Sequence, residues 1–206
     1  MSILRIIRWT AWILVAVAIF VATGIAVGWL RTEWLGQSPP GAVTTGTPAI
    51  GGPFSLVNHR GERVTQETFK GKPTAYFFGL THCLEVCPTT LFEMTPHLKE
   101  LGPDADRLNL VFVTVDPERD TPELLKTYLE SFDPRIVALT GTPEEVAAAA
   151  KAFRISYRKV PIEGGYTMDH TASVILTDGE GRFVTLIDYH EDAATALAKL
   201  KRAIPG

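Results

Sequence analysis

Residues 74–91 read Thr-Ala-Tyr-Phe-Phe-Gly-Leu-Thr-His-Cys-Leu-Glu-Val-Cys-Pro-Thr-Thr-Leu, and this stretch decides the fold. Its apolar and aromatic start, residues 74–78, lies between Pro73 and Gly79, which predicts a buried strand. Proline is preorganised for the first turn of a helix, so a helix is expected to begin at Pro88. Both cysteines therefore lie between the end of a central strand and the N-terminus of a helix.

The rest of residues 50–206 alternates short apolar runs with helix-start signals. Strands are expected at residues 54–57, 110–115, 136–139, 172–177 and 182–188, and helices after Thr121, after Thr142 and from Asp192. This order predicts an α/β domain with a central β-sheet flanked by helices. The succession of strand, cysteine loop and helix is the arrangement of a thioredoxin-like fold.

The two cysteines of the chain, Cys83 and Cys87, are too few for a scaffold held by disulfides. On a helical backbone, residues four apart place their sulfurs on the same side. A helix N-terminus favours the thiolate, which is both a nucleophile and a soft metal ligand. Two thiolates and an imidazole would suit copper, above all Cu(I), whereas zinc usually takes a fourth ligand.

A third ligand has to come from one of five histidines. His170 directly precedes the apolar run 172–177, whose leading loop is expected to pass the cysteines. From the local sequence alone, a ligand and a capped or surface residue are equally acceptable interpretations. The cysteine motif favours the ligand. His82 is expected to point away from the site or to tune Cys83, and the remaining histidines, His59, His97 and His190, are expected to be exposed to solvent.

An uncharged segment, residues 9–30, predicts a transmembrane anchor, because a helix of this length extends about 33 Å. Arg5 and Arg8 precede it, so residues 1–8 are expected in the cytoplasm and the domain on the outer side of the membrane. That side is the bacterial periplasm or the mitochondrial intermembrane space. A cleaved signal peptide is the alternative, but the long run without a small-x-small site favours an uncleaved anchor. Residues 31–49 are expected to be a linker to the domain, residues 50–206.

Composition excludes one class of partner. The chain has 206 residues, of which 46% are hydrophobic and 21% charged, and its formal net charge is −3. A nucleic-acid-binding protein needs a basic surface that neutralises phosphates, and this chain does not supply it. The length beyond the anchor suits a single domain with a substantial core.

A charged loop follows the strand at residues 110–115 and lies at the same sheet edge as the cysteines. Its charged residues are Asp116, Glu118, Arg119 and Asp120. We expect helix capping and surface ion pairs from Arg119 and Asp120. For Asp116 two interpretations stay open, namely the same surface role or part of a docking surface for a partner.

Residues 78–91, Phe-Gly-Leu-Thr-His-Cys-x3-Cys-Pro-Thr-Thr-Leu, closely resemble the signature of Sco/SenC/PrrC-type proteins. Three more stretches fit the same family: Gly-Gly-Pro-Phe at 51–54, Thr-Val-Asp-Pro-Glu-Arg-Asp-Thr-Pro at 114–122, and Asp-His-Thr at 169–171. The resemblance extends from Gly51 to the C-terminus, and the N-terminal anchor matches as well.

This resemblance implies that Cys83, Cys87 and His170 bind copper and that Asp169 supports His170. It implies a role in building the dinuclear copper site of cytochrome c oxidase subunit II, with other copper chaperones or thioredoxin-like reductants as further partners. Some members also reduce the cysteines of that site. Leu84-Glu85 stands where the family often has Pro-Asp, which loosens the loop and is expected to affect copper affinity and redox poise.

Three functions are compatible with a cysteine pair in this fold, and they differ in the residues that they need. A metallochaperone that turns over no small substrate needs His170. A thiol-disulfide oxidoreductase needs only the two cysteines, usually in a CxxC motif and with a proline in the loop where His170 lies. A peroxidase would carry a threonine three residues before the cysteine, whereas Thr81 is two residues before Cys83. The sequence favours the metallochaperone, with thiol-disulfide chemistry as the alternative.

Overall fold

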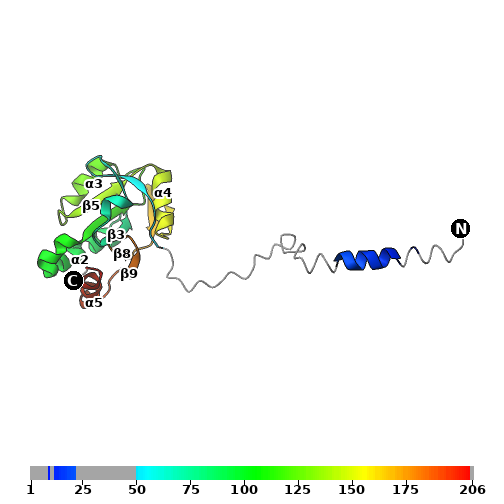
Figure 1. Ribbon diagram of the computed structural model, residues 1–206. Coiled ribbons are helices and arrows are strands. Elements are labelled where there is room, and N and C mark those ends of the chain that lie inside the picture. The colour runs from blue at the N-terminus through cyan, green and yellow to red at the C-terminus, as the bar shows by residue number, and fades with distance from the viewer. Residues whose placement is uncertain (1–8, 10–11, 22–49, 205–206) are drawn as a thin grey trace. The chain divides into compact units, whose positions relative to one another are not determined.

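The structure, a computed structural model, describes residue 9 and residues 12–21 and 50–204 (Figure 1). Residues 12–21 are helical. No helix within these ranges combines the length and the apolarity that crossing a membrane requires. The predicted segments 1–8 and 31–49 lie outside the described residues, as does half of the predicted segment 9–30. The stretch Thr47–Gly206 forms a compact unit of its own.

The domain is built on a mixed seven-stranded sheet with the order β2-β1-β5-β4-β3-β8-β9. Strands β3, β4 and β5 are parallel, and the other neighbouring strands pair antiparallel. The strands are β1 (Ser55–Asn58), β2 (Arg63–Thr65), β3 (Thr74–Gly79), β4 (Asn109–Thr114), β5 (Ile136–Thr140), β8 (Val174–Thr177) and β9 (Phe183–Ile187). The predicted α/β class and the predicted strands agree with this sheet to within two residues at each end.

Helices cover both faces of the sheet (Figure 1). They are α2 (Val86–Leu101), α3 (Pro122–Leu129), α4 (Pro143–Ala152) and α5 (Ala193–Ala203), with 3-10 turns η1 (Gln66–Phe69) and η2 (Gly102–Arg107). Alternate residues of β3 face opposite sides of the sheet. Tyr76 and Phe78 contact Phe153 at the end of α4, whereas Phe77 turns to the other side, toward Phe112. The aromatic run seen in the sequence therefore builds core on both faces.

Three helix starts follow from capping residues in the sequence. Thr121, Thr142 and Asp192 are the N-caps of α3, α4 and α5, and each side chain accepts a hydrogen bond from a backbone N–H of the first turn. Helix α2 begins at Val86 rather than at Pro88. Proline fits at the third helical position as well, because first-turn N–H groups have no partner within the helix.

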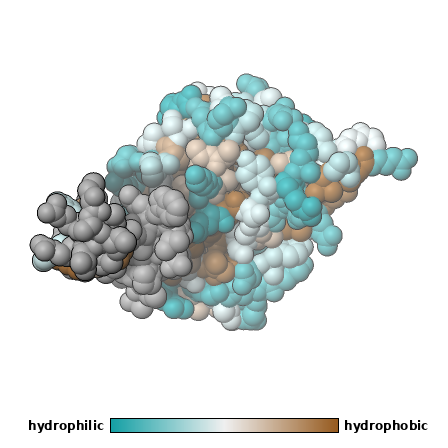
Figure 2. Space-filling model, turned by 90° about the vertical axis from the view of Figure 1, so that its right-hand side faces the viewer, coloured by the Kyte–Doolittle hydropathy of each residue, from teal (hydrophilic) through white to brown (hydrophobic). Residues whose placement is uncertain are grey.

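Hydrophilic residues cover most of the described surface on the face shown in Figure 2, and hydrophobic ones show mainly in the recesses between them. The core beneath is made by residues of every strand of the large sheet and by one side of each helix. This separation is typical of a globular domain with a single apolar core.

A second sheet was not predicted. Strands β6 (Tyr157–Ile162) and β7 (Gly165–His170) form an antiparallel hairpin around a two-residue turn, in which Gly164 has a φ of +81°. Only Met168 of this hairpin is buried. His170 is consequently the last residue of a strand and does not lie in the loop that the sequence suggested.

Candidate metal centre

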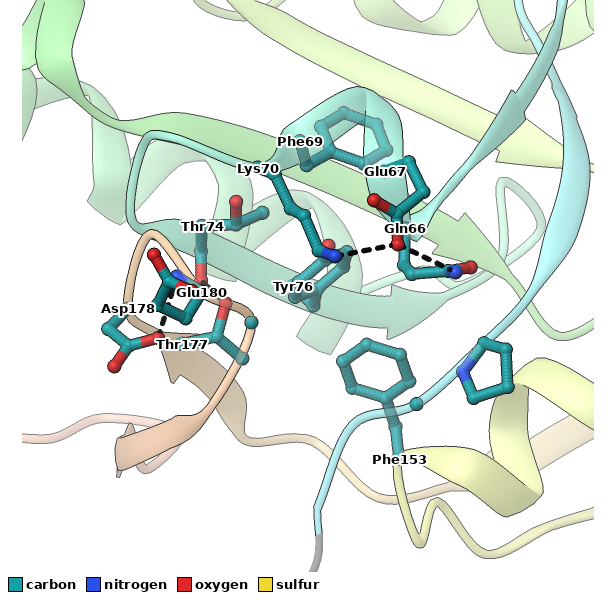
Figure 3. Close-up of a pocket in the computed structure, with 13 residues that line it drawn as sticks. Gln66, Glu67, Phe69, Lys70, Thr74, Tyr76, Phe153, Thr177, Asp178 and Glu180 are labelled. Carbon is teal, nitrogen blue, oxygen red and sulfur yellow. Dashed lines mark hydrogen bonds and ion pairs between the residues drawn. The ribbon is translucent and has the colours of Figure 1, made fainter.

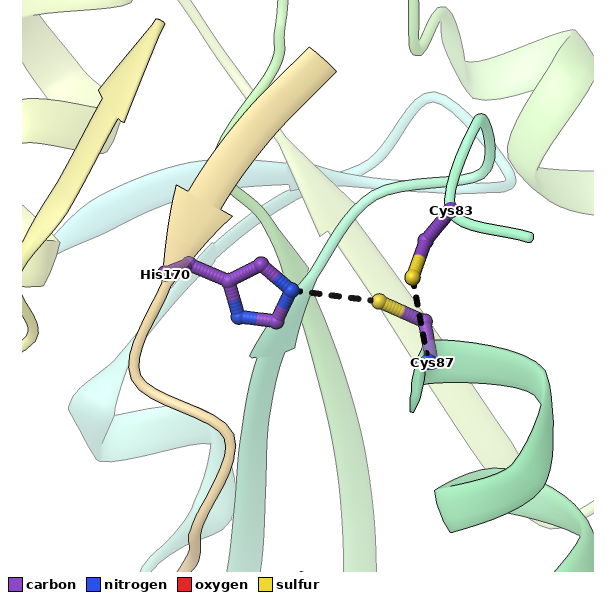
Figure 4. Close-up of side chains that lie close together, drawn as sticks. All are labelled: Cys83, Cys87 and His170. Carbon is purple, nitrogen blue, oxygen red and sulfur yellow. Dashed lines mark hydrogen bonds between the residues drawn. The ribbon is translucent and has the colours of Figure 1, made fainter. Parts of the chain in front are cut away.

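The structure brings together the three residues singled out in the sequence. One ligand atom from each of Cys83, Cys87 and His170 lies within 4.8 Å of the other two (Figure 4). The Nε2 atom of His170 is 3.4 Å from the Cys87 sulfur. The cluster therefore consists of two soft sulfur atoms and one imidazole nitrogen.

Each sulfur accepts a hydrogen bond from the backbone. The N–H of Cys87 donates to the Cys83 sulfur at 3.3 Å, and the N–H of Leu80 donates to the Cys87 sulfur at 3.5 Å. Cys87 lies in the first turn of α2 and is fully buried, whereas Cys83 is partly exposed in the preceding loop. Backbone donors and the helix N-terminus both stabilise negative charge on sulfur.

Gly79, at the end of β3, leaves room for the Cys87 sulfur. A Cβ at this position would lie 2.8 Å from that sulfur and 2.8 Å from a ring carbon of Phe112. Its backbone angle is not in the left-handed region, so the close approach is what requires glycine here. The sequence marked Gly79 only as the end of a strand.

The ring of His170 is oriented by a backbone carbonyl. Its Nδ1 donates to the oxygen of Thr171 at 2.9 Å, so in the neutral ring Nε2 is the nitrogen left to face the sulfurs. Asp169 was predicted to support His170. Its carboxylate instead accepts hydrogen bonds from Arg158 at 2.8 and 3.0 Å and is exposed. A supporting role of Asp169 through its charge stays a prediction.

In the metal-free cluster the pKa values of the two cysteines are shifted in opposite directions. A hydrogen bond from the Cys87 thiol, followed by contacts with His170 and backbone N–H groups, lowers the pKa of Cys83 to about 3 against the effect of burial. The hydrogen bond to Cys83 and burial raise the pKa of Cys87. Burial lowers the pKa of His170, but its contacts with Cys83 and with the Thr171 carbonyl raise it overall. One thiolate is therefore available without metal.

The other four histidines lie outside the cluster. The ring of His82 is about half exposed, and its Nδ1 lies 3.0 Å from the Thr81 hydroxyl. His190 is exposed and next to Glu93, as expected. The expected exposure is wrong for His59 and His97, which are half-buried; the Nδ1 of His59 accepts the Ala138 N–H. Burial lowers the pKa of both.

The charged loop after β4 differs from its prediction. Asp116 and Asp120 are 2% and 0% exposed, so the expected surface ion pair of Asp120 is wrong, and Asp116 cannot be a docking surface by its own side chain. Both carboxylates are buried because their partners come from distant segments, at Thr81 and Tyr166. No local sequence pattern predicts these pairings.

A cavity of about 230 Å³ lies near the start of β3. Figure 3 shows the residues that line it. Phe69, Tyr76 and Phe153 form its aromatic part, and Thr74, at the start of β3, also lines it. The cluster lies beyond the other end of β3, roughly 17 Å along the strand. None of the three ligand residues lines this cavity, so it is not a substrate pocket for the sulfurs.

A model of the SCO1/SenC family matches residues 42–205 of this chain. The chain belongs to the SCO1/SenC family. This confirms the resemblance seen in residues 78–91 and the thioredoxin-like α/β fold.

Two solved structures illustrate the relationship of this SCO1/SenC protein to known ones. The structure of Bradyrhizobium japonicum ScoI with copper bound is 50% identical, with a TM-score of 0.70, and the match covers 75% of this chain and 99% of that one. BsSco, described with a disulfide switch and as a member of the Sco family of cytochrome c oxidase assembly proteins, is 26% identical, with a TM-score of 0.60, over 75% of this chain and 93% of that one.

Curated relatives are longer. The human mitochondrial SCO1 homolog is 40% identical over 146 residues, which are 68% of this chain and 48% of the relative. The SCO1/SenC chain described here spans about half the length of the curated relatives it matches. The similarity therefore concerns the domain that carries the cysteines and the histidine.

Proposed function

We propose that this protein is a metallochaperone that binds one copper ion through Cys83, Cys87 and His170 and delivers it to the dinuclear copper site of cytochrome c oxidase subunit II. The observation that carries the proposal is the convergence of two sulfurs and one imidazole nitrogen within 4.8 Å. Sulfur ligands and low coordination suit Cu(I). The copper-bound ScoI structure, and the membership of BsSco in a family of cytochrome c oxidase assembly proteins, support the same assignment.

The site is suited to releasing its cargo as well as to binding it. Among the residues that the structure describes, no histidine, cysteine or carboxylate joins the cluster as a fourth ligand. Cys83 is partly exposed, and the neighbouring Leu84 is 98% exposed. A thiolate of a partner protein can therefore approach the ion from the side of this loop and replace one ligand at a time.

Copper stoichiometry on the reduced protein tests the binding step. The parent and His170→Ala are loaded with Cu(I) under anaerobic conditions, and His190→Ala serves as the control because His190 is exposed and outside the cluster. We expect one copper per chain in the parent and the control, and at least tenfold weaker binding without the His170 ligand. Equal retention by His170→Ala would exclude the three-ligand site.

Delivery requires a second measurement. The Cu(I)-loaded protein is mixed with the reduced, metal-free copper domain of subunit II, and the transferred copper is then oxidised by one electron with ferricyanide, because an all-Cu(I) site is colourless and EPR-silent. The visible and EPR signals of the oxidised dinuclear site are followed. Appearance of these signals supports the chaperone function. Persistent copper on the donor with a reduced acceptor present would contradict it.

The alternative function is reduction of a partner's disulfide, and the low pKa of Cys83 favours it. The Cys83 thiolate attacks one sulfur of the disulfide and forms a mixed disulfide with the partner. Cys87 then attacks the Cys83 sulfur, and the partner's second sulfur leaves as a thiolate. Two electrons pass to the partner, which gains two thiols by taking one proton from Cys87 and one from solvent, and the pair Cys83–Cys87 becomes a disulfide. His170→Ala separates the functions, since this reduction is expected to continue in that variant while copper binding weakens.

We also infer that residues 9–30 anchor the protein, with its domain on the outer side of the membrane. The absence of charge in this segment and the arginines before it support the inference. Protease treatment of intact spheroplasts tests it. Digestion of the domain is expected, and protection of the domain would contradict the orientation.

A further inference from the structure

The cysteine loop is tied to the loop that follows β4. The buried carboxylate of Asp120 accepts the backbone N–H of Thr81 at 3.0 Å and the Thr81 hydroxyl at 2.5 Å. It also accepts the hydroxyl of Thr114, the last residue of β4, at 2.6 Å. Because Thr81 is two residues before Cys83, Asp120 fixes the root of the loop that carries this sulfur. Hydrogen bonds to a buried carboxylate are among the stronger ones in a protein.

The other end of the same loop holds the hairpin of β6 and β7. The carboxylate of Asp116 accepts the Tyr166 hydroxyl at 3.0 Å and the Arg119 Nε–H at 2.5 Å. Arg119 also donates to the backbone oxygen of Tyr166 at 3.0 Å, and its guanidinium lies 3.9 Å from the centre of the Tyr166 ring. Lys159 lies 4.1 Å from the same ring. Tyr166 is therefore held through its hydroxyl, its ring and its backbone.

Besides the contacts of Tyr166, an ion pair between Lys159 and Glu118 at 2.8 Å joins the hairpin to the loop, and the hairpin has few further supports. It pairs with none of the seven strands of the large sheet in the part of the chain that the structure describes, and Met168 is its one buried residue. A cavity of about 400 Å³ is lined by residues of both the loop and the hairpin, among them Asp116, Glu118, Tyr157 and Met168. Apolar packing between the loop and the hairpin is thus incomplete, and polar contacts at Tyr166 bridge the two.

We propose that Arg119 and Tyr166 are positioning residues for the metal centre, and that they act on copper binding through His170. Tyr166 and His170 lie four residues apart on β7, so a strand of roughly 13 Å joins the held residue to the ligand. Through Asp120 the same loop is bound to the cysteine side of the centre, and through Asp116 it is bound to the hairpin. The relative position of imidazole and sulfurs is thereby set by one segment. This inference rests on the proposed copper function.

A double-mutant cycle tests whether the effect passes through His170. Cu(I) affinity is measured by competition with a chromogenic Cu(I) chelator for the parent and for Tyr166→Leu, and again with His170→Ala present. Groups that orient metal ligands change affinity by 10–100-fold when they are removed. We expect Tyr166→Leu to weaken Cu(I) binding about tenfold in the parent and less than about twofold in the His170→Ala background, where no ligand is left to position.

Two further variants guard the interpretation. Ile162→Ala alters an exposed residue near the tip of the same hairpin and is expected to change affinity less than about twofold. Tyr166→Phe keeps the ring between Arg119 and Lys159 and removes only the hydroxyl, so it is expected to fold and to weaken binding about threefold, again only when His170 is present. Equal losses in both His170 backgrounds, or no loss in either Tyr166 variant, would overturn the proposal.

A measurement without copper separates this inference from the proposed function. The rings of His170 and Phe77 have centroids 6.3 Å apart, which is close enough for NOE contacts in the reduced, metal-free protein. We expect Tyr166→Leu to abolish these contacts and Ile162→Ala to retain them. A parent that binds no copper would refute the copper function while this readout still judges the positioning. Unchanged contacts in Tyr166→Leu would refute the positioning.

Discussion

Replacing Cys87 with serine isolates the Cys83 thiol beside a hydroxyl that still donates a hydrogen bond. The pKa of Cys83 is lowered from 9.0 to about 3, chiefly by the hydrogen bond from residue 87. Because the pKa of Cys83 is lowered, its thiolate persists until the pH falls to about that pKa. Between pH 5 and pH 8 Cys83 should therefore be almost completely ionised, and its reactivity should not change with pH.

The magnitude follows from two opposing effects. At pH 5, a thiol with a pKa of 9.0 is thiolate in about one molecule in 10⁴, whereas Cys83 is nearly all thiolate. A drop of about six pKa units, with a Brønsted exponent of 0.4–0.5, lowers intrinsic nucleophilicity about 250- to 1000-fold. Cys83 should therefore react about 10- to 40-fold faster than an ordinary thiol at pH 5, and more slowly than one at pH 8.

The assay is the rate of reaction with 2,2′-dithiodipyridine in the reduced Cys87→Ser protein. A ratio of the rates at pH 8 and pH 5 close to one is expected, against about 10³ for an ordinary thiol. Cys83→Ser is the matched control, since burial still raises the pKa of the remaining Cys87 and its rate should rise across the whole range. A tenfold rise per pH unit in Cys87→Ser would refute the reasoning.

Gly79→Ala places a Cβ 2.8 Å from the Cys87 sulfur and should lower the free energy of unfolding by about 1–3 kcal/mol in denaturant titrations. Gly165→Ala is its control, because a Cβ there meets nothing within 4 Å; equal stability of the two variants would contradict the crowding argument. Asp120→Asn replaces one of two accepting carboxylate oxygens with an NH2 group that cannot accept, so at least one hydrogen bond from Thr81 is lost. We expect a loss of about 2 kcal/mol by the same titration, and a loss below about 0.5 kcal/mol would show that the bond to Thr81 contributes little.

Much of the fold could be predicted because it is encoded locally. Thr142 followed by Pro143 and Glu145 specifies a helix start through a capping box, and the structure has the reciprocal hydrogen bonds. The apolar run of β3 is buried on both faces, as a central strand in a sheet covered by helices must be. Signals of this kind need no knowledge of distant segments.

The hairpin of β6 and β7 escaped prediction because its residues lack a clear period. β6 contains Arg158, Lys159 and Pro161, and proline is disfavoured in strands that need its N–H. The one usable signal was the Glu163-Gly164 pair, which makes the two-residue turn. Strand β7 also lacks a clear period, so the sequence predicts a loop before the run 172–177.

The metal centre was predictable in its ligands but not in its supports. Soft ligand chemistry and spacing identified the cysteines, and the apolar strand after His170 drew attention to that residue. The carbonyl of Thr171 and the carboxylates of Asp116 and Asp120 act through contacts that form only in the folded chain. The sequence predicts surface positions for charged loop residues such as Asp116 and Asp120, because it does not reveal partners that lie 50 and 39 residues away.

The separation of Cys87 from His170 by 83 residues links the metal centre to the order of folding. Closing so long a loop costs entropy that only the assembled strands β3, β4, β5 and β8 repay. A chain still emerging from the ribosome or translocon carries both thiols long before it carries the imidazole. An ion held by all three groups therefore marks a completed domain, and by mass action it stabilises that state alone.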